Sequence, residues 1–426
     1  MIIIGDTMYS GGPNGMRPSV GLSANLKKHG LEILRFKTGT PSRVDRRSLH
    51  MDKMELEEGD PENHAFSFMS ERKDRNKRNC WLTYTNEKTH EIIRENIMRA
   101  PKYAGKIHGI GARYCPSIED KVVRFADKDR HQLFVEPEGL DTTEMYVQGM
   151  STSMPIDVQY AFLRTIPGFE DVKMMRPAYA IEYDLLDPLQ LYPTLEVIKL
   201  PGLYSAGQSN GTSGYEEAAA QGLVAGINAA LKIQGKDPFI LARHEAYIGS
   251  LVDDLVTKGA DEPYRMMTSR SEYRLILRQD NADLRLTEKG HSIGLVGEER
   301  YARFLERKKK YEEAMDYIRT QRFTPKEEIN RALESMGTAP LTTGTGADQI
   351  LKRPEMTYRK MMETLGCPAF DEEAVEEMEI TVKYEGYIAR QAAAVRKAAR
   401  MENEKLPLDM DLSLIHISEP TRHSLI

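Results

Sequence analysis

Apolar positions recur along the chain with two different periods. Short apolar runs bounded by turn residues predict strands at 31–41, 80–85 and 131–139, and a helical pattern occupies 87–100. Beyond about Lys236 the apolar positions follow the helical period through long charged stretches such as 298–321 and 387–405. The pattern therefore predicts an α/β part followed by an α-helical part.

A glycine-rich stretch at 202–232 interrupts this pattern and has the order strand, loop, helix. Free backbone N–H groups and the positive end of the helix suit a phosphate or an electron-rich ring. Ala218, Gly222 and Gly226 recur every four residues and predict close packing of the helix on a sheet. An ordinary tight turn without a ligand remains open, because the partner motif G-x-G-x-x-G is missing and 109–114 holds only two of its glycines.

Charge and cysteine content narrow the class of protein. The net charge of −6 argues against nonspecific nucleic-acid binding by the chain as a whole, but leaves a local basic surface possible. Three scattered cysteines form neither a disulfide framework nor a CxxC metal pair, so we expect a reducing compartment and no metal site. No apolar run is long enough to span a bilayer, and we expect a cytoplasmic protein with no membrane partner.

Cys115 is the cysteine with the most suggestive surroundings. Pro116 favours extended backbone at the residue before it, which places Cys115 in a loop. Arg113 and Lys121 would lower the pKa of a nearby thiol, whereas Glu119 and Asp120 would oppose them. From these residues alone a packing role is favoured, since most free cysteines behave as small buried apolar groups.

Several unusual strings occur together in one order. They are "YSGGPNGMRPS", "RFKTGTP", "TYTNEKTH", "GARYCPSIEDKVVRF", "HQLFVEPEG", "AGQSNGTSGYEEAAAQGLVAGINAA" and "TSRSEYRLILRQDNADLRLT". From about Ile2 to Asp411 the chain closely resembles the tRNA uridine 5-carboxymethylaminomethyl modification enzymes, the MnmG or GidA family. The resemblance implies an α/β fold: a partial Rossmann-like FAD-binding domain with an inserted mixed α/β domain, followed by an α-helical C-terminal domain.

The same resemblance implies domain boundaries. We expect a partial FAD-binding domain at 1–42 and 146–235, an inserted NAD-binding domain at 43–145, and a helical domain for tRNA and partner binding at 236–411. The family's N-terminal unit with G-x-G-x-x-G is absent from this sequence. Residues 412–426 break from the family pattern and back-translate into a sequencing adapter, so we expect a non-native tail on an internal fragment that is inactive by itself.

Family function implies a reaction and its cofactors. The complete enzyme would add a carboxymethylaminomethyl or aminomethyl group to C5 of the wobble uridine, using FAD, NADH and a methylene-tetrahydrofolate carbon donor. Its expected partners are tRNA, the MnmE GTPase and a second copy of itself in a homodimer. Two alternatives are a folate- and FAD-dependent tRNA uridine methyltransferase, whose known motifs lack the "RYCPSIEDK" string, and a noncatalytic tRNA- or partner-binding module.

Site residues follow from matching motifs position by position. The resemblance makes Cys115 a catalytic thiol, which reverses the order of likelihood given by the residues alone, and assigns Ser19 and Gln208 to FAD. It assigns one continuous segment to the nicotinamide dinucleotide: Gly111, Ala112, Arg113, Tyr114, Cys115, Pro116, Ser117, Ile118, Glu119, Asp120, Lys121, Val122, Val123, Arg124 and Phe125. Ala112 stands where proline is commoner in the family.

Contacts to tRNA require local basic groups. Arg270, Arg274 and Arg278 are spaced four residues apart and would share one face if their segment is helical. A second basic run occupies 70–78. Either group also fits a solvated surface, and Glu272 offers the arginines a nearby carboxylate. We expect the three arginines to contact tRNA phosphates, with a solvated surface as the alternative that stays open.

Overall fold

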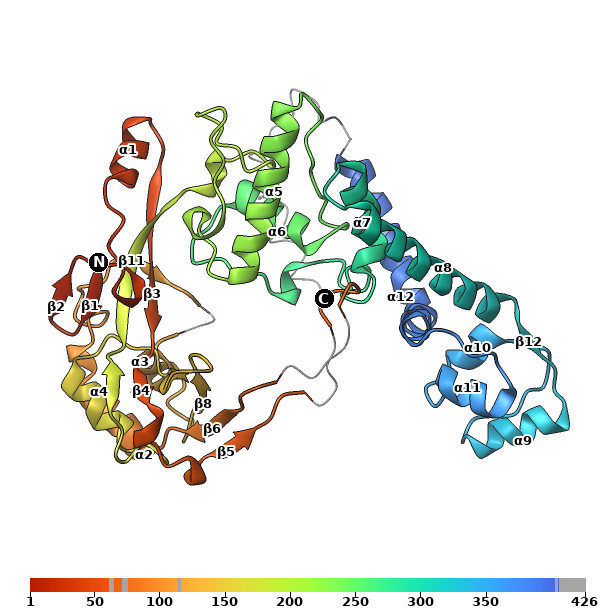
Figure 1. Cartoon of the computed structure of the whole chain (residues 1–426), viewed down its shortest axis with the longest axis horizontal. Helices are drawn as coiled ribbons and strands as arrows, with labels where there is room; N and C mark the ends of the chain where they lie inside the picture. Colours follow the sequence, from red (N-terminus) through yellow and green to blue (C-terminus); the bar gives the residue numbers. More distant parts are fainter. Residues whose placement is uncertain (61–64, 71–75, 114–115, 403–404, 406–426) are drawn as a thin grey trace, which may run out of the picture. The chain divides into compact units, whose positions relative to one another are not determined.

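The computed structural model describes residues 1–60, 65–70, 76–113, 116–402 and 405. The chain divides into two compact units, Met1–Ser271 and a second that begins at Glu272 (Figure 1). Cys115, Tyr114 and the predicted tail 412–426 lie outside the described residues, as does most of the basic run 70–78. No helix in the described part of the chain is long and apolar enough to cross a membrane.

Two sheets organise the first unit. One has five strands in the order β2-β1-β11-β3-β7, and the other has six in the order β10-β4-β9-β8-β6-β5. The strands are β1 Ile2–Ile4, β2 Thr7–Tyr9, β3 Ile33–Thr40, β4 Arg43–Asp45, β5 Glu55–Glu57, β6 Cys80–Tyr84, β7 Ile110–Gly111, β8 Gln132–Pro137, β9 Glu144–Gln148, β10 Met174–Arg176 and β11 Tyr179–Leu186. Among the paired strands of the described residues, β3 and β7 are parallel and the other pairs are antiparallel.

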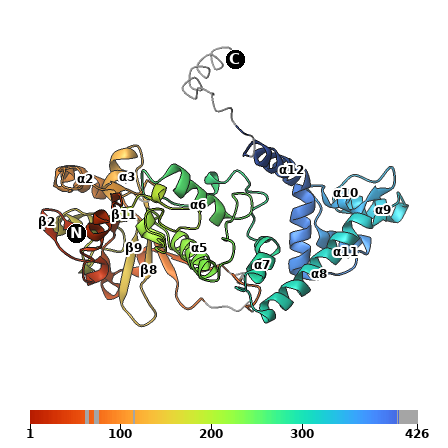
Figure 2. The ribbon, with the colours of Figure 1, turned by 90° about the horizontal axis from the view of Figure 1, so that it is seen from above.

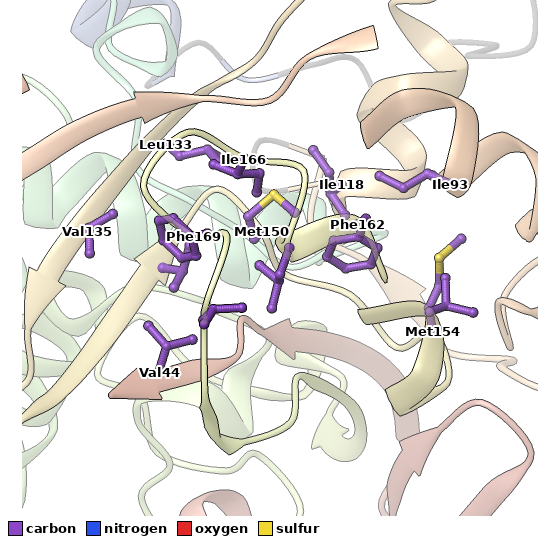
Figure 3. Close-up of a cluster of buried hydrophobic side chains, with 14 of the residues drawn as sticks. Val44, Ile93, Ile118, Leu133, Val135, Met150, Met154, Phe162, Ile166 and Phe169 are labelled. Atoms are coloured by element: carbon purple, nitrogen blue, oxygen red, sulfur yellow. The ribbon is translucent and has the colours of Figure 1, made fainter. Parts of the chain in front are cut away.

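The six-stranded sheet supports the largest apolar core of the first unit. Alternate residues of β8 and β9 point inward, among them Leu133, Val135 and Met145, and each is fully buried. They meet apolar side chains from α2 Glu87–Glu95, α3 Ile118–Arg124 and α4 Ile156–Leu163. Figure 3 shows this cluster, in which Phe162 and Ile118 come from α4 and α3. The core fixes α3, and with it the C-terminal half of the 111–125 segment.

Helices surround the end of the five-stranded sheet. The helices of the first unit also include α1 Leu22–Lys28, α5 Tyr215–Ile233 and α6 Tyr247–Lys258. Val224 and Ala225 of α5 and Val252 of α6 share a buried cluster with Leu186 at the end of β11. The sequence places its helical domain from about Lys236, and α6 lies in the first compact unit.

The second unit is almost entirely helical and has its own core. Its helices are α7 Ala282–Ser292, α8 Glu298–Thr320, α9 Glu327–Ser335, α10 Ala347–Leu351, α11 Tyr358–Leu365 and α12 Glu372–Glu402, with a short pair of strands, β12 Arg322–Phe323 and β13 Thr345–Gly346. Ile318, Tyr358 and Met378 are fully buried in that core. The mixed α/β architecture followed by helices confirms the predicted fold class.

Candidate functional site

The glycine-rich segment forms a tight turn that leads into α5. The strand predicted before it is reduced to a single bridge between Tyr204 and Glu196, and a short 3₁₀ helix, η6 Gly207–Asn210, follows. Gly207 and Gly211 have φ angles of 78° and 85°, a left-handed conformation that glycine adopts without strain. Bending at these glycines replaces the expected extended strand and ends the turn at the start of α5.

Gly211 is also required by the space around it. A Cβ atom at this position would lie 2.9 Å from Leu185 Cδ1 and 3.0 Å from Ala260 Cβ. Gly222 and Gly226 differ, because a Cβ atom on either would meet nothing within 4 Å. The expected close packing of a small-residue stripe is therefore wrong for these two glycines, which face away from the buried side of α5. The helix instead packs through Glu217, Gln221, Val224 and neighbouring residues of that side.

One buried amide holds the turn in shape. Gln221 Oε1 accepts hydrogen bonds from Gly207 N at 3.1 Å and Asn210 Nδ2 at 2.9 Å. Gln221 Nε2 donates to Thr212 Oγ1 at 3.0 Å. Asn210 Nδ2 also donates to Ser205 O at 2.8 Å, while its Oδ1 is buried without a partner. A turn whose backbone is fixed by side chains beneath it presents a preorganised upper surface.

The first turn of α5 is tied to the segment that follows α6. Glu217 Oε1 accepts a hydrogen bond from Met266 N at 2.7 Å, and its Oε2 is buried without a partner. Tyr264 extends the link, because its N–H donates to Gly211 O at 2.8 Å and its carbonyl accepts from Ser213 N at 2.9 Å. The chain at 264–266 thus braces the glycine-rich turn from one side.

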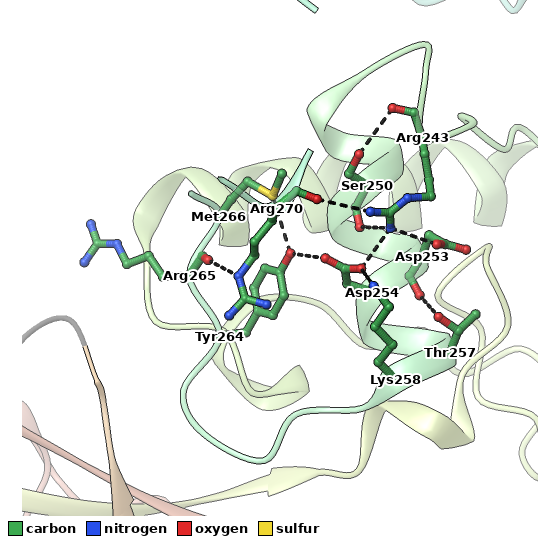
Figure 4. Close-up of polar contacts among 10 residues, drawn as sticks. All are labelled: Arg243, Ser250, Asp253, Asp254, Thr257, Lys258, Tyr264, Arg265, Met266 and Arg270. Atoms are coloured by element: carbon green, nitrogen blue, oxygen red, sulfur yellow. Dashed lines mark hydrogen bonds and ion pairs between the residues drawn. The ribbon is translucent and has the colours of Figure 1, made fainter. Parts of the chain in front are cut away.

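Tyr264 is in turn held by a charged network (Figure 4). Its hydroxyl donates to Asp254 Oδ2 at 2.8 Å, and Asp254 Oδ1 accepts from Arg243 at 2.8 Å and Lys258 at 2.7 Å. Burial alone would raise the pKa of Asp254, but hydrogen bonds from Lys258, Tyr264 and Arg243 hold it below its usual value. The same burial, together with Asp254, raises the pKa of Tyr264, so the hydroxyl stays a donor.

The two residues expected to contact FAD both lie on exposed turns. Gln208 sits in η6 and hydrogen-bonds the hydroxyl of Tyr183 on β11. Burial raises the pKa of that tyrosine. Ser19 lies in the loop before α1. Within the described residues no hydrogen bond joins the side chains of Ser19 and Gln208. FAD binding by Ser19 and FAD binding by Gln208 therefore stay two separate predictions.

The segment expected to bind a nicotinamide dinucleotide begins on β7 and ends on α3. Gly111 pairs in parallel with Lys37 of β3, and a Cβ atom on Gly111 would lie 2.6 Å from Lys37 Cε. The side chain of Lys37 therefore passes over the bare glycine and is largely buried. Lys121 Nζ donates to Gly149 O at 3.3 Å. Lys37 was not apparent from sequence, because it lies 74 residues before Gly111 in the chain.

The pKa values of two adjacent acids on α3 are shifted in opposite directions. Burial raises the pKa of Glu119, which is 1% exposed, and its Oε2 has no hydrogen-bond partner. Asp120 is also buried, but Lys102 Nζ at 2.7 Å and the Tyr103 hydroxyl at 3.1 Å keep its pKa below the usual value. A second buried group without a partner, Ser117 Oγ, lies at the start of the helix. These groups offer unused hydrogen-bonding capacity in the segment that follows the predicted thiol in sequence.

The structure gives the three arginines different roles. The described chain from Ser271 to Asn281 contains no helix, so the condition for a shared helical face is not met. Arg270 stacks on Tyr264, with its guanidinium carbon 4.2 Å from the ring centre, and Arg278 pairs with Asp280 at 2.9 Å. Arg274 is exposed. Tertiary pairing of two of the arginines was invisible in their spacing.

Known proteins of the MnmG/GidA family are similar to this chain along nearly its whole length. Residues 1–237 match the family model described as glucose inhibited division protein A, and residues 298–392 match the tRNA modifying enzyme MnmG/GidA C-terminal helical domain. The tRNA uridine 5-carboxymethylaminomethyl modification enzyme MnmG of Caldicellulosiruptor saccharolyticus is 55% identical over 97% of this chain and 66% of its own length. That of Heliobacterium modesticaldum is 54% identical over 100% of this chain and 68% of its own.

Solved structures agree with the sequence relatives. GidA of Aquifex aeolicus in its form I crystal superposes with a TM-score of 0.84 and 45% identity, covering 100% of this chain and 69% of that one. The form II crystal gives a TM-score of 0.83 and 44% identity. The chain spans about two thirds of the length of the curated relatives that it matches, 66% in the first case given above.

Proposed function

Since the chain belongs to the MnmG/GidA family, we propose that the complete protein modifies the wobble uridine of tRNA at C5. The observation that carries the proposal is sequence identity above 50% to MnmG enzymes along nearly the whole chain. We further propose the family's working set: FAD, NADH, a methylene-tetrahydrofolate carbon donor, the MnmE GTPase as partner, and a homodimer. Bound flavin and nicotinamide would supply the redox steps of one-carbon transfer to the pyrimidine.

The residues around the glycine-rich turn fit a flavin in their donor set. Among the described residues no side chain caps α5 at Gly214 by a hydrogen bond, although the Glu217 carboxylate folds back against Gly214, so the first N–H groups of a 19-residue helix keep hydrogen-bonding capacity. Gln208 adds an exposed amide that both donates and accepts hydrogen bonds. In the proposal, Gln208 and the start of α5 orient the cofactor, and the Gln221 amide keeps the turn rigid beneath it.

The α3 segment fits the second half of the proposal. Ser117 Oγ and Glu119 Oε2 are buried polar atoms without hydrogen-bond partners among the described residues, and such atoms suit the hydroxyl and amide groups of a nicotinamide dinucleotide. Cys115 is the proposed nucleophile. A thiolate that adds to C6 of uracil makes C5 nucleophilic, which is the reason that the chemistry needs a cysteine.

Nucleoside analysis tests the proposed function. Cells without their own MnmG-type gene are supplied with the complete gene for this protein, and their tRNA is digested and analysed. We expect wobble uridines that carry a carboxymethylaminomethyl or aminomethyl group at C5. The appearance of 5-methyluridine instead would support the methyltransferase alternative, and tRNA binding without any product would support a noncatalytic module.

A further inference from the structure

Helix α12 changes character near its middle. Its first half is packed and acidic: Met378 and Val382 are buried in the helical core, Glu379 pairs with Lys383 at 2.6 Å, and Glu385 pairs with Lys352 at 2.7 Å. From Lys383 to Met401 no residue is buried. The second half of the helix therefore leaves the core while remaining helical, as the dark blue end of α12 in Figure 2 shows.

Between Glu385 and Glu402, all charged residues of the unburied half are basic. From Gly386 to Arg400 the sequence contains no Asp or Glu, and it carries four exposed cations, Arg390, Arg396, Lys397 and Arg400. At about 100° per residue these four side chains occupy roughly 120° of the helix circumference. Alanines fill much of the remaining surface and favour the helix without burial. We call this surface, defined by the four cations, the α12 basic face.

Pairing distinguishes the α12 basic face from an ordinary charged helix surface. On α8, Lys308 pairs with Glu288 at 2.7 Å, Lys309 with Glu313 at 3.8 Å, and Lys310 with Glu306 at 3.2 Å. Among the described residues, none of the four cations of the α12 basic face has an ion-pair partner. Four unneutralised cations on one face attract a polyanion.

Aromatic rings flank the α12 basic face at its N-terminal end. Tyr384 and Tyr387 are 44% and 55% exposed, with ring centroids 6.4 Å apart. The guanidinium carbon of Arg390 lies 4.7 Å from the centre of the Tyr387 ring. Exposed aromatic rings beside arginines are the surface on which proteins stack unpaired nucleobases.

One further exposed arginine, Arg274, belongs to a segment that is hydrogen-bonded to α12. Gln391 Oε1 accepts hydrogen bonds from Leu275 N at 3.1 Å and Ile276 N at 3.2 Å, and Gln391 Nε2 donates to Glu272 O at 3.2 Å. These three bonds bracket Arg274, which is exposed. Gln391 thus holds the backbone that carries Arg274 against α12, on the side of the helix away from the α12 basic face.

We propose that the α12 basic face, extended by Tyr387, binds the sugar–phosphate backbone of RNA. This inference rests on the proposed function and names a surface for its substrate. A polyanion with unpaired bases matches both the cations and the exposed tyrosines. A membrane would require a free apolar face opposite the cations, but there Ile388 and Val395 are half-buried and Gln391 is bonded to the segment 272–276. Because the chain as a whole has a net charge of −6, the α12 basic face is a local concentration of positive charge.

The test compares two triple variants of the complete protein. Arg390→Gln, Lys397→Gln and Arg400→Gln together neutralise the α12 basic face. The matched control, Lys309→Gln, Arg331→Gln and Arg359→Gln, removes three cations that are at least 75% exposed and that pair with carboxylates on their own helices. The dissociation constant of unmodified tRNA is measured by fluorescence anisotropy between about 50 and 200 mM salt.

We expect the first variant to weaken tRNA binding by 10-fold or more, on the order of that expected for three lost phosphate contacts, and to reduce the slope of log K against log salt by about 2 to 3. The control should change neither quantity. Tyr387→Leu should weaken binding without changing the slope, because stacking releases no counterions.

Equal affinity and slope in the first variant and the control would overturn the inference. Loss of binding to a partner protein with tRNA affinity intact would also overturn it, in favour of an acidic protein ligand. Failure of the unaltered complete protein to bind tRNA counts against the proposed function instead, so the two failures are distinguishable. Circular dichroism of each variant confirms that α12 remains helical.

Discussion

A single substitution at Cys115 distinguishes a catalytic role of its thiol from a packing role. In the complete protein we expect Cys115→Ser to abolish modification while flavin content, melting temperature and tRNA affinity stay close to the unaltered values. Serine preserves the shape of the side chain but is a far poorer nucleophile near neutral pH. Nucleoside analysis, flavin absorbance, a thermal melt and fluorescence anisotropy with tRNA measure the four quantities. Modification at a rate near that of the unaltered enzyme would remove Cys115 from the mechanism.

Glu377 on α12 is expected to make stability fall as pH rises. Burial, followed by the charges of Asp280 and Asp283, raises its pKa from 4.5 to about 8, against the opposing effect of Arg278 and Arg307. Between these two values the folded chain holds a proton that the unfolded chain has released. Stability is therefore greatest below the unfolded pKa and declines as pH rises to about 8, by at most about 1.4 kcal/mol per pH unit.

The matching variant is Glu377→Gln, which keeps the shape and cannot ionise. We expect its melting temperature to exceed that of the unaltered chain by a margin that grows from about pH 5 to pH 8. Glu376→Gln, on the exposed side of the same helix turn, is the control. Parallel melting curves for the Glu377→Gln variant and the unaltered chain across this range would contradict the prediction.

Motif matching located single residues but not their supports. The strings around Gln208 and Cys115 identified a family, and the comparisons confirm that family. Gln221, which fixes the turn beneath Gln208, and Lys37, which crosses Gly111, come from segments whose local pattern gives no sign of these contacts. Such contacts depend on tertiary packing between distant segments, which neither spacing nor composition encodes.

Two glycines near and within α5 predict opposite effects of the same substitution. Gly211→Ala places a methyl group 2.9 Å from Leu185 and keeps a φ of 85°, so we expect a loss of stability of more than about 1 kcal/mol. Gly222→Ala meets open space inside a helix and should gain about 0.5–1 kcal/mol. Urea unfolding of the 426-residue chain measures both. Destabilisation by Gly222→Ala would show that α5 is closely packed at that position after all.

Long periodic elements were predictable, and irregular ones were not. The strands at 31–41, 80–85 and 131–139 and the helix at 298–321 occur near their predicted positions, because burial of one face determines them. The helix predicted at 387–405 falls in the unburied second half of α12, which begins earlier, at Glu372. The strand before the glycine-rich turn forms only one bridge, because the chain bends at Gly207. The segment at 271–281 is not helical, since its backbone bonds are made partly with Gln391.

The apolar clusters of the two units share no residues in the described part of the chain. In the described part of the chain, the three apolar clusters of the first unit lie between Leu26 and Met266, and that of the second lies between Tyr311 and Val382. Each unit thus has the means to fold by its own burial. The sequence indicated an α/β part and a helical part from their periodicities, but the position of the division follows from which core each helix joins.

The second unit is therefore expected to fold alone. A fragment of residues 272–402 should give a helical circular dichroism spectrum and a cooperative thermal melt, because it keeps Ile318, Tyr358 and Met378 in one core. A shorter fragment, 272–356, serves as the control: it lacks α11 and α12, removes Tyr358, Met378 and Val382 from the core, and should melt without cooperativity. If the longer fragment also melts without cooperativity, its core requires the first unit, and the division at Ser271 does not mark an independent domain.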